Sequence, residues 1–289
     1  MITLPEAFEQ EMKQLLGEEE YEAYRKTFDE AVHRGLRVNN GKISTEEFLR
    51  RTDIPLKKVP WIPNGFYYDE ESCNPAKDAD YYAGLYYLQE PSAMTPASRL
   101  PIEPDDRVLD LCAAPGGKAT ELGSRIGEGG MLLANDISNS RAKALLRNLE
   151  IQGVGRLLVT SEDPEKLVTL YPAFFDKILL DAPCSGEGMF RKESSMVRYY
   201  RENGPEHYVP IQKKLIEQAY QMLAEGGELL YSTCTFSVKE NEEVIAGLLD
   251  AHPDMEVQEI TPGYEGFAPG VSVNGRDLSR CVHIFPQRM

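Results

Sequence analysis

Long apolar runs, basic side chains and paired cysteines are all scarce in this sequence of 289 residues. No stretch reaches the roughly 18 consecutive apolar residues of a membrane-spanning helix, so no membrane partner is expected. The N-terminus lacks the basic-then-apolar layout of a signal peptide. Five widely spaced cysteines, at 73, 112, 184, 234 and 281, include no Cys-x-x-Cys pair. We therefore expect neither a disulfide framework nor a metal, and a reducing cytoplasm as the location.

Basic residues are outnumbered, because 31 Lys and Arg face 47 Asp and Glu and leave a formal net charge of −16. This balance argues against a general polyanion-binding protein, since phosphate contacts require Lys and Arg. Two segments are locally basic: residues 34–58 hold seven basic against three acidic side chains, and residues 190–214 hold six against three. They are candidate contacts for a phosphate backbone, with an ordinary solvated surface as the alternative.

What the sequence does contain is a regular alternation of short apolar runs and helical patterns. Strands are predicted at 108–111, 131–134, 157–160, 177–180 and 228–232, and helices at 118–126, 138–149, 163–170, 210–223 and 239–251. Repeated strand–helix units predict an α/β fold with a doubly wound parallel sheet. Strand candidates at 255–260 and 279–285 predict a closing antiparallel hairpin. Residues 1–95 are expected to form a small N-terminal α+β module that begins with two amphipathic helices separated near Gly17.

A glycine turn follows the first predicted strand of the large sheet, at Cys112-Ala113-Ala114-Pro115-Gly116-Gly117-Lys118. Strand, glycine turn and helix together form a common nucleotide-binding arrangement. The turn lacks the third glycine of the dinucleotide fingerprint, which disfavours a nicotinamide dehydrogenase. A P-loop would need Gly and Ser or Thr where Cys112 and Ala119 stand. Asp136 lies 136 − 117 = 19 residues after Gly117, close to the roughly 20 expected of a ribose-binding acid. These features fit S-adenosylmethionine, and plain turn chemistry is the alternative.

Two cysteines follow the ends of successive predicted strands. Asp181-Ala-Pro-Cys184 comes directly after strand 177–180, and Thr233-Cys234 directly after strand 228–232. Ligands of open α/β sheets bind at the carboxyl ends of the strands, so neighbouring strands would bring both thiols to the cofactor edge. The alternative for either cysteine is a small buried apolar side chain.

Three ordered motifs carry a resemblance to a known family. They are Asp110-Leu-Cys-Ala-Ala-Pro-Gly-Gly-Lys118, Asp181-Ala-Pro-Cys-Ser-Gly-Glu-Gly188, and Tyr231-Ser-Thr-Cys-Thr235 followed by Glu240-Asn-Glu-Glu243. They resemble the signatures of the Nop/Sun family of RNA 5-methylcytosine methyltransferases, and most of all its bacterial small-subunit ribosomal RNA methyltransferase F branch. The resemblance spans about residues 36–286 and is far more specific for the family than for the RNA target.

The resemblance implies a Rossmann-like, S-adenosylmethionine-dependent methyltransferase domain over residues 96–289. It implies methyl transfer to carbon 5 of a cytosine in ribosomal RNA, through a covalent adduct between a cysteine and the cytosine. Transfer RNA as the substrate and a non-catalytic RNA-binding assembly factor are the alternatives. Bacterial relatives commonly continue into a C-terminal RNA-binding domain, whereas this sequence ends at Met289. That domain is therefore expected to be absent.

The same resemblance implies roles for individual residues. Cys234 is the implied nucleophile, Cys184 assists release of the product, and Asp181 contacts the cytosine and borders the cofactor. Cys112 through Lys118 line the methionine part of the cofactor, and Asp136 holds its ribose. Asp163 lies near the adenine, with Glu162 or a simple helix start as alternatives for this position. The side chains expected to hold flanking phosphates are Arg191, Lys192, Arg198 and Arg201.

Overall fold

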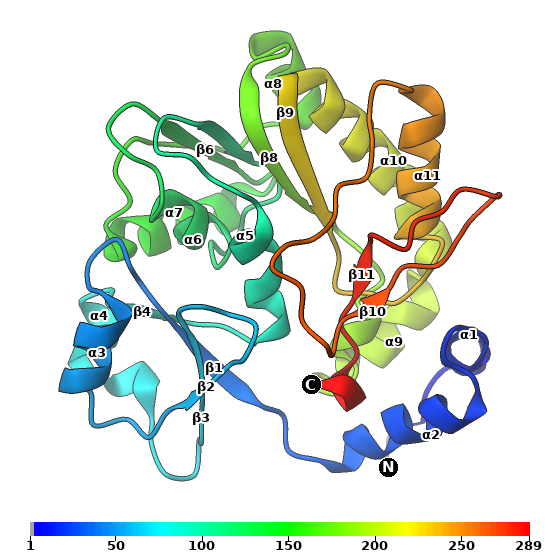
Figure 1. The fold of residues 1–289 in the computed structure, drawn as a ribbon, viewed down its shortest axis with the longest axis horizontal. Coiled ribbons are helices and arrows are strands. Elements are labelled where there is room, and N and C mark those ends of the chain that lie inside the picture. The colour runs from blue at the N-terminus through cyan, green and yellow to red at the C-terminus, as the bar shows by residue number, and fades with distance from the viewer. Residues whose placement is uncertain (1–2) are drawn as a thin grey trace. The chain divides into compact units, whose positions relative to one another are not determined.

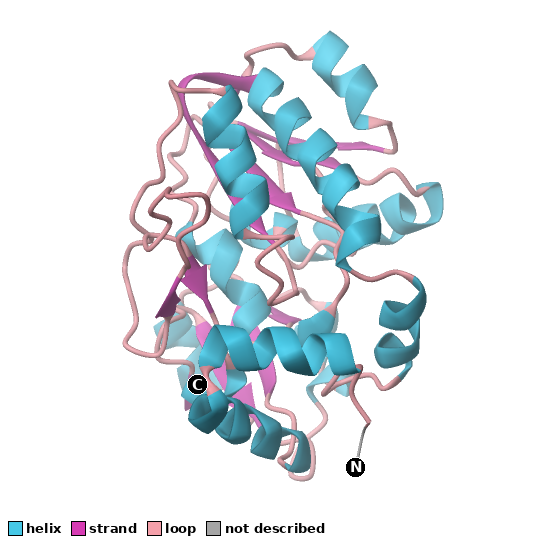
Figure 2. Ribbon diagram, turned by 90° about the vertical axis from the view of Figure 1, so that its right-hand side faces the viewer, coloured by secondary structure: helices cyan, strands magenta, loops and turns pink. Residues whose placement is uncertain are grey.

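The computed structural model describes residues 3–289, whose helices, strands and loops are distinguished in Figure 2. These residues form two compact units. Unit 1 contains the described residues up to Val32, together with Ala182–Ile216 and Thr233–Met289, and unit 2 contains His33–Asp181 and Glu217–Ser232. Neither unit ends at residue 95, where the sequence predicted a boundary. Residues 33–95 share unit 2 with the large sheet, and the residues before them belong to unit 1.

The large sheet of unit 2 has five parallel strands in the order β7-β6-β5-β8-β9 (Figure 1). The strands are β5 (Arg107–Asp110), β6 (Met131–Asn135), β7 (Leu157–Thr160), β8 (Phe175–Asp181) and β9 (Leu223–Ser232). Parallel strands are joined by right-handed crossovers, so helices on the two sides of β5 cover opposite faces. The predicted doubly wound sheet is confirmed, and its strand order reverses between β5 and β8, where such folds bind ligands.

The connecting helices bury the apolar side chains of this sheet. They are α5 (Thr95–Arg99), α6 (Ala119–Gly123), α7 (Asn139–Gln152), α8 (Pro164–Leu170) and α10 (Pro205–Met222). The core includes Val108 and Leu132 from the strands, and Leu145 and Leu149 from α7, all fully buried. Leu145 and Leu149 are four residues apart, so they project from one face of the helix. This packing holds the strands and α7 together, and the site residues lie at the carboxyl ends of the strands of this sheet or in the loops that follow them.

A second, antiparallel sheet in unit 2 has the order β2-β3-β1-β4. Its strands are β1 (Arg34–Val38), β2 (Lys57–Lys58), β3 (Gly65–Tyr68) and β4 (Tyr86–Leu88), and the helices beside it in the chain are η2 (Pro75–Lys77), α4 (Ala79–Tyr82) and η3 (Ser92–Met94). Helix α3 (Thr45–Arg51) begins after Ser44, whose hydroxyl accepts a hydrogen bond from the backbone N–H of Glu47. Phe48 from this helix packs in a core with Leu36 and Val38.

Unit 1 is built around aromatic side chains that come from distant parts of the chain. Its elements are α1 (Glu6–Leu16), α2 (Glu18–Lys26), η1 (Thr27–Asp29), η4 (Glu187–Met189), α9 (Ser195–Glu202), α11 (Glu242–Ala251), β10 (Ala268–Pro269), β11 (Val282–His283) and η5 (Pro286–Arg288). The two predicted N-terminal helices are confirmed, and Gly17 separates them with φ of 78°. Phe8 and Tyr24 from these helices pack with Phe190 and Tyr200.

Two predictions for the chain after residue 185 need correction. Residues 255–260 form a loop rather than a strand, and the antiparallel pairing near the chain end is a separate two-stranded sheet of β10 and β11 (Figure 1). The sequence pattern also missed η4 and α9. A membrane-crossing helix of sufficient length and apolar character is absent from residues 3–289.

Candidate active site

The glycine turn of unit 2 joins the end of β5 to α6. The N–H of Ala113 donates to the carbonyl of Asn135 at 2.8 Å, which ties the turn to the end of β6. Gly116 has φ of 112°, a conformation that side chains with a Cβ rarely adopt. A Cβ on Gly117 would lie 2.9 Å from Nε2 of Gln89. The backbone conformation therefore favours glycine at position 116, whereas a side chain at position 117 would require the Gln89 side chain to shift. Ala113 and Ala114 are buried, and Pro115 is exposed.

Arg37 of β1 stabilises this turn through hydrogen bonds. Its side chain is 2% exposed, and it donates to the carbonyl of Gly117 at 2.6 Å and to Oγ1 of Thr120 at 2.7 Å. Its Nε lies 2.8 Å from a carboxylate oxygen of Glu121. Arg37 belongs to the locally basic segment 34–58, but its guanidinium is committed inside unit 2. A phosphate backbone cannot reach it there.

Asp110 is the last residue of β5 and is fully buried. Among residues 3–289, neither of its carboxylate oxygens has a side-chain hydrogen-bond partner. Burial, together with the nearby charge of Asp181, raises the pKa of Asp110 to about 8, and Lys118 opposes the rise. Burial likewise raises the pKa of Cys112. Both groups are therefore mainly protonated near neutral pH.

Asp136 lies directly after β6 and is 2% exposed. It accepts a hydrogen bond from the N–H of Ser138 at 3.0 Å, and its second oxygen lies 3.3 Å from the guanidinium of Arg141. Arg141 also donates to the carbonyl of Ala114 at 2.8 Å. One arginine thus links Asp136 to the glycine turn. The structure places Asp136 at the edge expected from its spacing.

Asp163 is exposed and caps α8, because its side chain accepts from the N–H of Glu165 at 2.9 Å. The neighbouring Glu162 donates its N–H to Oδ1 of Asn135 at 3.0 Å, and its carboxylate accepts from Lys166 at 2.8 Å. Each carboxylate therefore has a local structural partner. A role for either residue toward an adenine stays a prediction.

Asp181 ends β8 and carries two charged or polar partners within unit 2. Its carboxylate accepts from Nζ of Lys118 at 2.6 Å and from Oγ of Ser232 at 2.8 Å. Lys118 directly precedes α6, and Ser232 ends β9. One carboxylate thereby joins the ends of β8 and β9 to the start of α6. Lys118 thus pairs with the carboxylate that ends β8.

The two thiols predicted to act together meet in unit 1. The sulfur of Cys184 lies 3.2 Å from the sulfur of Cys234, and the backbone N–H of Cys234 donates to the Cys184 sulfur at 3.3 Å. Cys234 is exposed and Cys184 is buried. The hydrogen bond to Cys234, reinforced by burial, raises the pKa of Cys184. The buried thiol therefore keeps its proton, and the exposed sulfur is the one that a substrate can reach.

A buried polar network surrounds the thiols and contains residues that the sequence motifs named without a role. The carboxylate of Glu240, fully buried, accepts from the N–H of Ser185 at 2.9 Å and from Nε2 of Gln212 at 2.9 Å. The hydroxyl of Ser185 also donates to this carboxylate and lies 2.9 Å from Oγ1 of Thr235. The Glu-Asn-Glu-Glu segment signalled Glu240, whereas Gln212 had no sequence signal.

Glu187 is a second buried carboxyl beside the thiol loops. Its Oε2 accepts from the N–H of Phe236 at 2.9 Å. Burial, reinforced by the nearby charge of Glu11, raises the pKa of Glu187 to about 8. The loop after Cys184 is held further by the N–H of Gly188, which donates to the carbonyl of Cys234 at 2.9 Å. Both thiol-bearing loops are thus joined through backbone as well as side-chain bonds.

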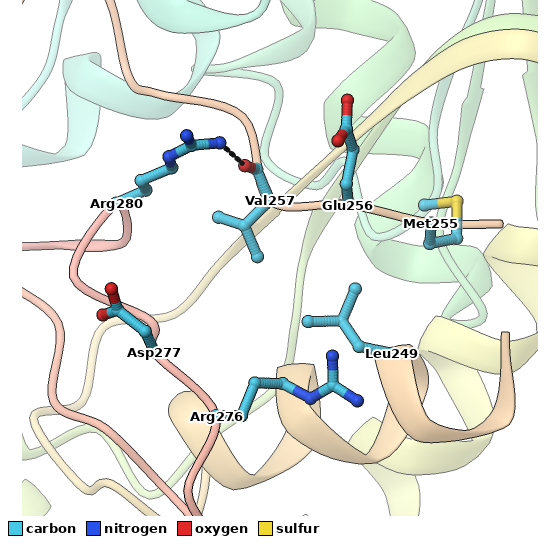
Figure 3. Close-up of a pocket in the computed structure, with 7 residues that line it drawn as sticks. All are labelled: Leu249, Met255, Glu256, Val257, Arg276, Asp277 and Arg280. Carbon is cyan, nitrogen blue, oxygen red and sulfur yellow. Dashed lines mark hydrogen bonds between the residues drawn. The ribbon is translucent and has the colours of Figure 1, made fainter. Parts of the chain in front are cut away.

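The remaining predicted residues lie on the surface of unit 1. Nε of Arg191 donates to the carbonyl of Thr27 at 2.9 Å, so part of its guanidinium supports the fold. Arg198 is 88% exposed in its side chain and lies 3.7 Å from Glu202. A separate cavity, lined by Leu249, Met255, Glu256, Val257, Arg276, Asp277 and Arg280, contains none of the predicted site residues (Figure 3).

The chain matches two known protein-family descriptions, one for each part of its length. Residues 97–289 match the family described as 16S rRNA methyltransferase RsmB/F, and residues 4–91 match the N-terminal domain of 16S rRNA methyltransferase RsmF. The ribosomal RNA small subunit methyltransferases F of Erwinia tasmaniensis and Escherichia coli O157:H7 are 36% and 33% identical to the chain. Each alignment covers 99% of this chain and 61% of the relative, so the chain spans about three fifths of their length.

Two solved structures share the fold. A methyltransferase homologue protein from Pyrococcus horikoshii is 27% identical, with a TM-score of 0.73 over 99% of this chain and 92% of that one. NSun6 from Pyrococcus horikoshii is 22% identical, with a TM-score of 0.81 over 98% of this chain and 94% of that one. The second similarity concerns the fold alone.

Proposed function

Because the chain belongs to the 16S rRNA methyltransferase RsmB/F family, we propose that it transfers a methyl group from S-adenosylmethionine to carbon 5 of a cytosine in ribosomal RNA. One observation carries the proposal: an exposed cysteine sulfur lies 3.2 Å from a buried one. The names of the curated relatives support ribosomal RNA as the substrate. Methylation of transfer RNA is retained as an outcome of the test.

The chemistry explains why a thiol is needed. Carbon 5 of cytosine is too weak a nucleophile to displace a methyl group unaided. Addition of the Cys234 thiolate to carbon 6 makes an enamine, and carbon 5 then forms a bond to the methyl group as the methyl–sulfonium bond breaks. Transfer of the carbon 5 proton to a water molecule restores the ring double bond and expels Cys234 as a thiolate. Its exposed position suits Cys234 for the attack.

The buried thiol assists the exposed one in both directions. Because the pKa of Cys184 is raised, its S–H remains available to donate to the sulfur of Cys234. A hydrogen bond donated to a thiolate favours the charged form. It therefore stabilises the nucleophile before attack and the leaving thiolate at release. This gives Cys184 its proposed part in product release.

We assign Asp181 to the amino group and ring nitrogen of the cytosine. Lys118 and Ser232 fix the orientation of its carboxylate within unit 2. Asp181 stands three residues before Cys184, and Ser232 stands two residues before Cys234. Asp181 and the serine that orients it therefore each lie a few residues before one of the two cysteines.

The residues of the glycine turn fit S-adenosylmethionine. When bound, this cofactor supplies an electrophilic methyl group on a positively charged sulfur. The carboxylates of Asp136 and Asp181 lie near the turn, which favours a cationic ligand with hydroxyl and ammonium donors over a pyrophosphate. We propose that Asp136 accepts from the ribose hydroxyls. The methionine part would lie along residues 112–118, and Asp163 remains the candidate near the adenine.

The cytosine must leave its stack to be methylated, so a loop or an opened helix is the proposed substrate. Arg191, Lys192, Arg198 and Arg201 are the proposed contacts to flanking phosphates.

We retain a functional division near residue 95, supported by separate family matches to residues 4–91 and 97–289. The need for reduced thiols supports a reducing cytoplasm as the location.

The experiment measures methyl transfer from labelled S-adenosylmethionine to ribosomal RNA and to transfer RNA, with bisulfite mapping of the product. Cys234→Ala should lower turnover by at least about 1,000-fold and form no covalent complex. Cys184→Ala should accumulate a protein–RNA complex that survives denaturation. Cys73→Ala is the matched control, because this thiol donates to the carbonyl of Asp69 in unit 2. It should leave turnover unchanged.

Other outcomes separate the alternatives. If Cys184→Ala turned over normally while Cys234→Ala trapped RNA, the two roles would be reversed. Methylation of transfer RNA alone would retain the chemistry and overturn the substrate. A protein that binds RNA without transferring methyl groups, and that S-adenosylhomocysteine does not stabilise against heat, would be an assembly factor.

A further inference from the structure

Glu240 occupies an unusual position for an acidic residue. Its side chain is fully buried in unit 1, and a buried carboxylate is costly unless hydrogen bonds compensate for the lost hydration. The compensating donors come from the loop that carries Cys184 and from α10. They are the N–H and the hydroxyl of Ser185, which follows Cys184, and the side chain of Gln212.

The network reaches the second thiol loop through one hydroxyl. Oγ of Ser185 lies 2.9 Å from Oγ1 of Thr235, which follows Cys234. Gln212 also donates to the carbonyl of Pro183, which precedes Cys184, at 2.9 Å. The residues next to each cysteine are therefore bound, directly or through one hydroxyl, to the same carboxylate. Three backbone N–H groups also join the loops: Gly188 donates to the carbonyl of Cys234, Cys234 to the sulfur of Cys184, and Phe236 to the carboxylate of Glu187.

We propose that Glu240 is a positioning residue that fixes the distance between the sulfurs of Cys184 and Cys234. It touches neither sulfur through these bonds and acts by holding Ser185, and through it Thr235. Its effect on turnover rests on the proposed function, whereas its effect on the distance between the thiols does not. A shift of about 1 Å between reacting groups can lower a rate about 100-fold.

The distance between the thiols can be measured without methyl transfer. Hydrogen peroxide oxidises an accessible thiolate to a sulfenic acid, and a neighbouring thiol displaces water from it to form a disulfide. Two S–H groups are oxidised in this sequence, and the peroxide is reduced to water. The rate of the Cys184–Cys234 bond, followed by peptide mass spectrometry, reports how often the two sulfurs meet. Wild type should form this bond readily, because its sulfurs are 3.2 Å apart.

Glu240→Ala should lower this rate about tenfold and turnover about 100-fold, without changing KM for S-adenosylmethionine. Glu240→Gln should restore both rates to within a few-fold of wild type. Its amide oxygen can still accept, and the Ser185 hydroxyl can accept from its NH₂ group while donating to Thr235. Glu243→Gln is the matched control, because Glu243 is exposed in the same segment, and it should behave as wild type.

Thermal unfolding shows which variants are folded. Should Glu240→Ala not fold, Ser185→Ala replaces it, since it removes only the hydroxyl that joins the two loops, and it should slow disulfide formation. A folded Glu240→Ala or Ser185→Ala protein that forms the disulfide at the wild-type rate would overturn the proposal. The proposal would also be overturned if Glu240→Gln lowered the disulfide rate and turnover as much as Glu240→Ala does. If disulfide formation slowed as expected but wild type methylated no RNA, the proposed function would fail and the positioning role would stand.

Discussion

The titration of Asp110, a single residue at the end of β5, should make the stability of the folded protein depend on pH. Its pKa of about 8 in the folded protein exceeds the usual carboxyl value of 3.8, mainly because it is buried. The folded state therefore keeps a proton that the unfolded chain has already released. Stability should fall as pH rises from about 4 to about 8, and should level off above that range.

Asp110→Asn removes this titration while keeping the size of the side chain. Relative to wild type, the variant should gain on the order of 5 kcal/mol between pH 4 and pH 9, because it has no proton to lose. Urea unfolding at a series of pH values measures the difference. Asp105→Asn, an exposed residue just before the same strand, is the control. Parallel stability curves for Asp110→Asn and wild type would contradict the assignment.

The thiol pair makes a related point about single residues. Chemically identical side chains differ here because one is buried and the other is exposed. The difference assigns proton retention to Cys184 and access to substrate to Cys234. Neither property can be found in the neighbouring letters of the sequence, since both cysteines follow short polar or proline-containing segments.

Among the elements, β1 contributes an arginine that bonds directly to the glycine turn. Arg37 carries this link through its bonds to Gly117, Thr120 and Glu121. Arg37→Met should lower stability by about 3–5 kcal/mol, because it leaves Glu121 buried without its main partner. It should also weaken cofactor binding, since the carbonyl of Gly117 loses its donor.

Urea unfolding and calorimetric titration with S-adenosylhomocysteine test both effects. Arg34→Gln serves as the control on the same strand, because Arg34 pairs with Glu70 on the surface at 2.7 Å with both side chains about half exposed. Its loss should cost no more than about 1 kcal/mol. Equal effects of the two substitutions would contradict a specific role for Arg37.

Elements with strong local patterns were predictable, and those that depend on pairing were not. β7 has the predicted bounds, and β8 extends its prediction by only a few residues, because apolar runs between turns indicate strands. Residues 255–258 alternate apolar and polar side chains, but residues 255–260 pair with no strand among residues 3–289 and form a loop. Helix α9 was missed although it buries Val197 and Tyr200 on one face.

At the scale of the whole molecule, the net charge of −16 limits how the proposed RNA substrate could bind. Long-range attraction to a polyanion is unfavourable, so local basic side chains must supply the phosphate contacts. Of the segment 34–58, Arg37 is committed inside unit 2, and Lys42 donates to the carbonyls of Ala83 and Ile151. The exposed side chains of α9 are the better candidates.

Replacing Arg198 and Arg201 together by Gln should weaken RNA binding and reduce its dependence on salt. For single-stranded RNA, each lost phosphate contact lowers the slope of log affinity against log salt by about 0.7. Filter binding over a range of KCl concentrations measures this slope, and S-adenosylhomocysteine affinity should stay unchanged. A slope equal to that of wild type would exclude both arginines from the phosphate path.

The sequence by itself determined the strand–helix alternation, the glycine turn and the order of the motifs, because these depend on neighbouring residues and on spacing along the chain. Only the tertiary structure decided that Cys184 and Cys234, 50 residues apart, bring their sulfurs within 3.2 Å. It also decided which thiol is buried, and that Glu240 and Arg37 lie beneath the thiol loops and the glycine turn, respectively. Burial and hydrogen bonding arise from residues that meet only after the chain has folded, so no local pattern encodes them.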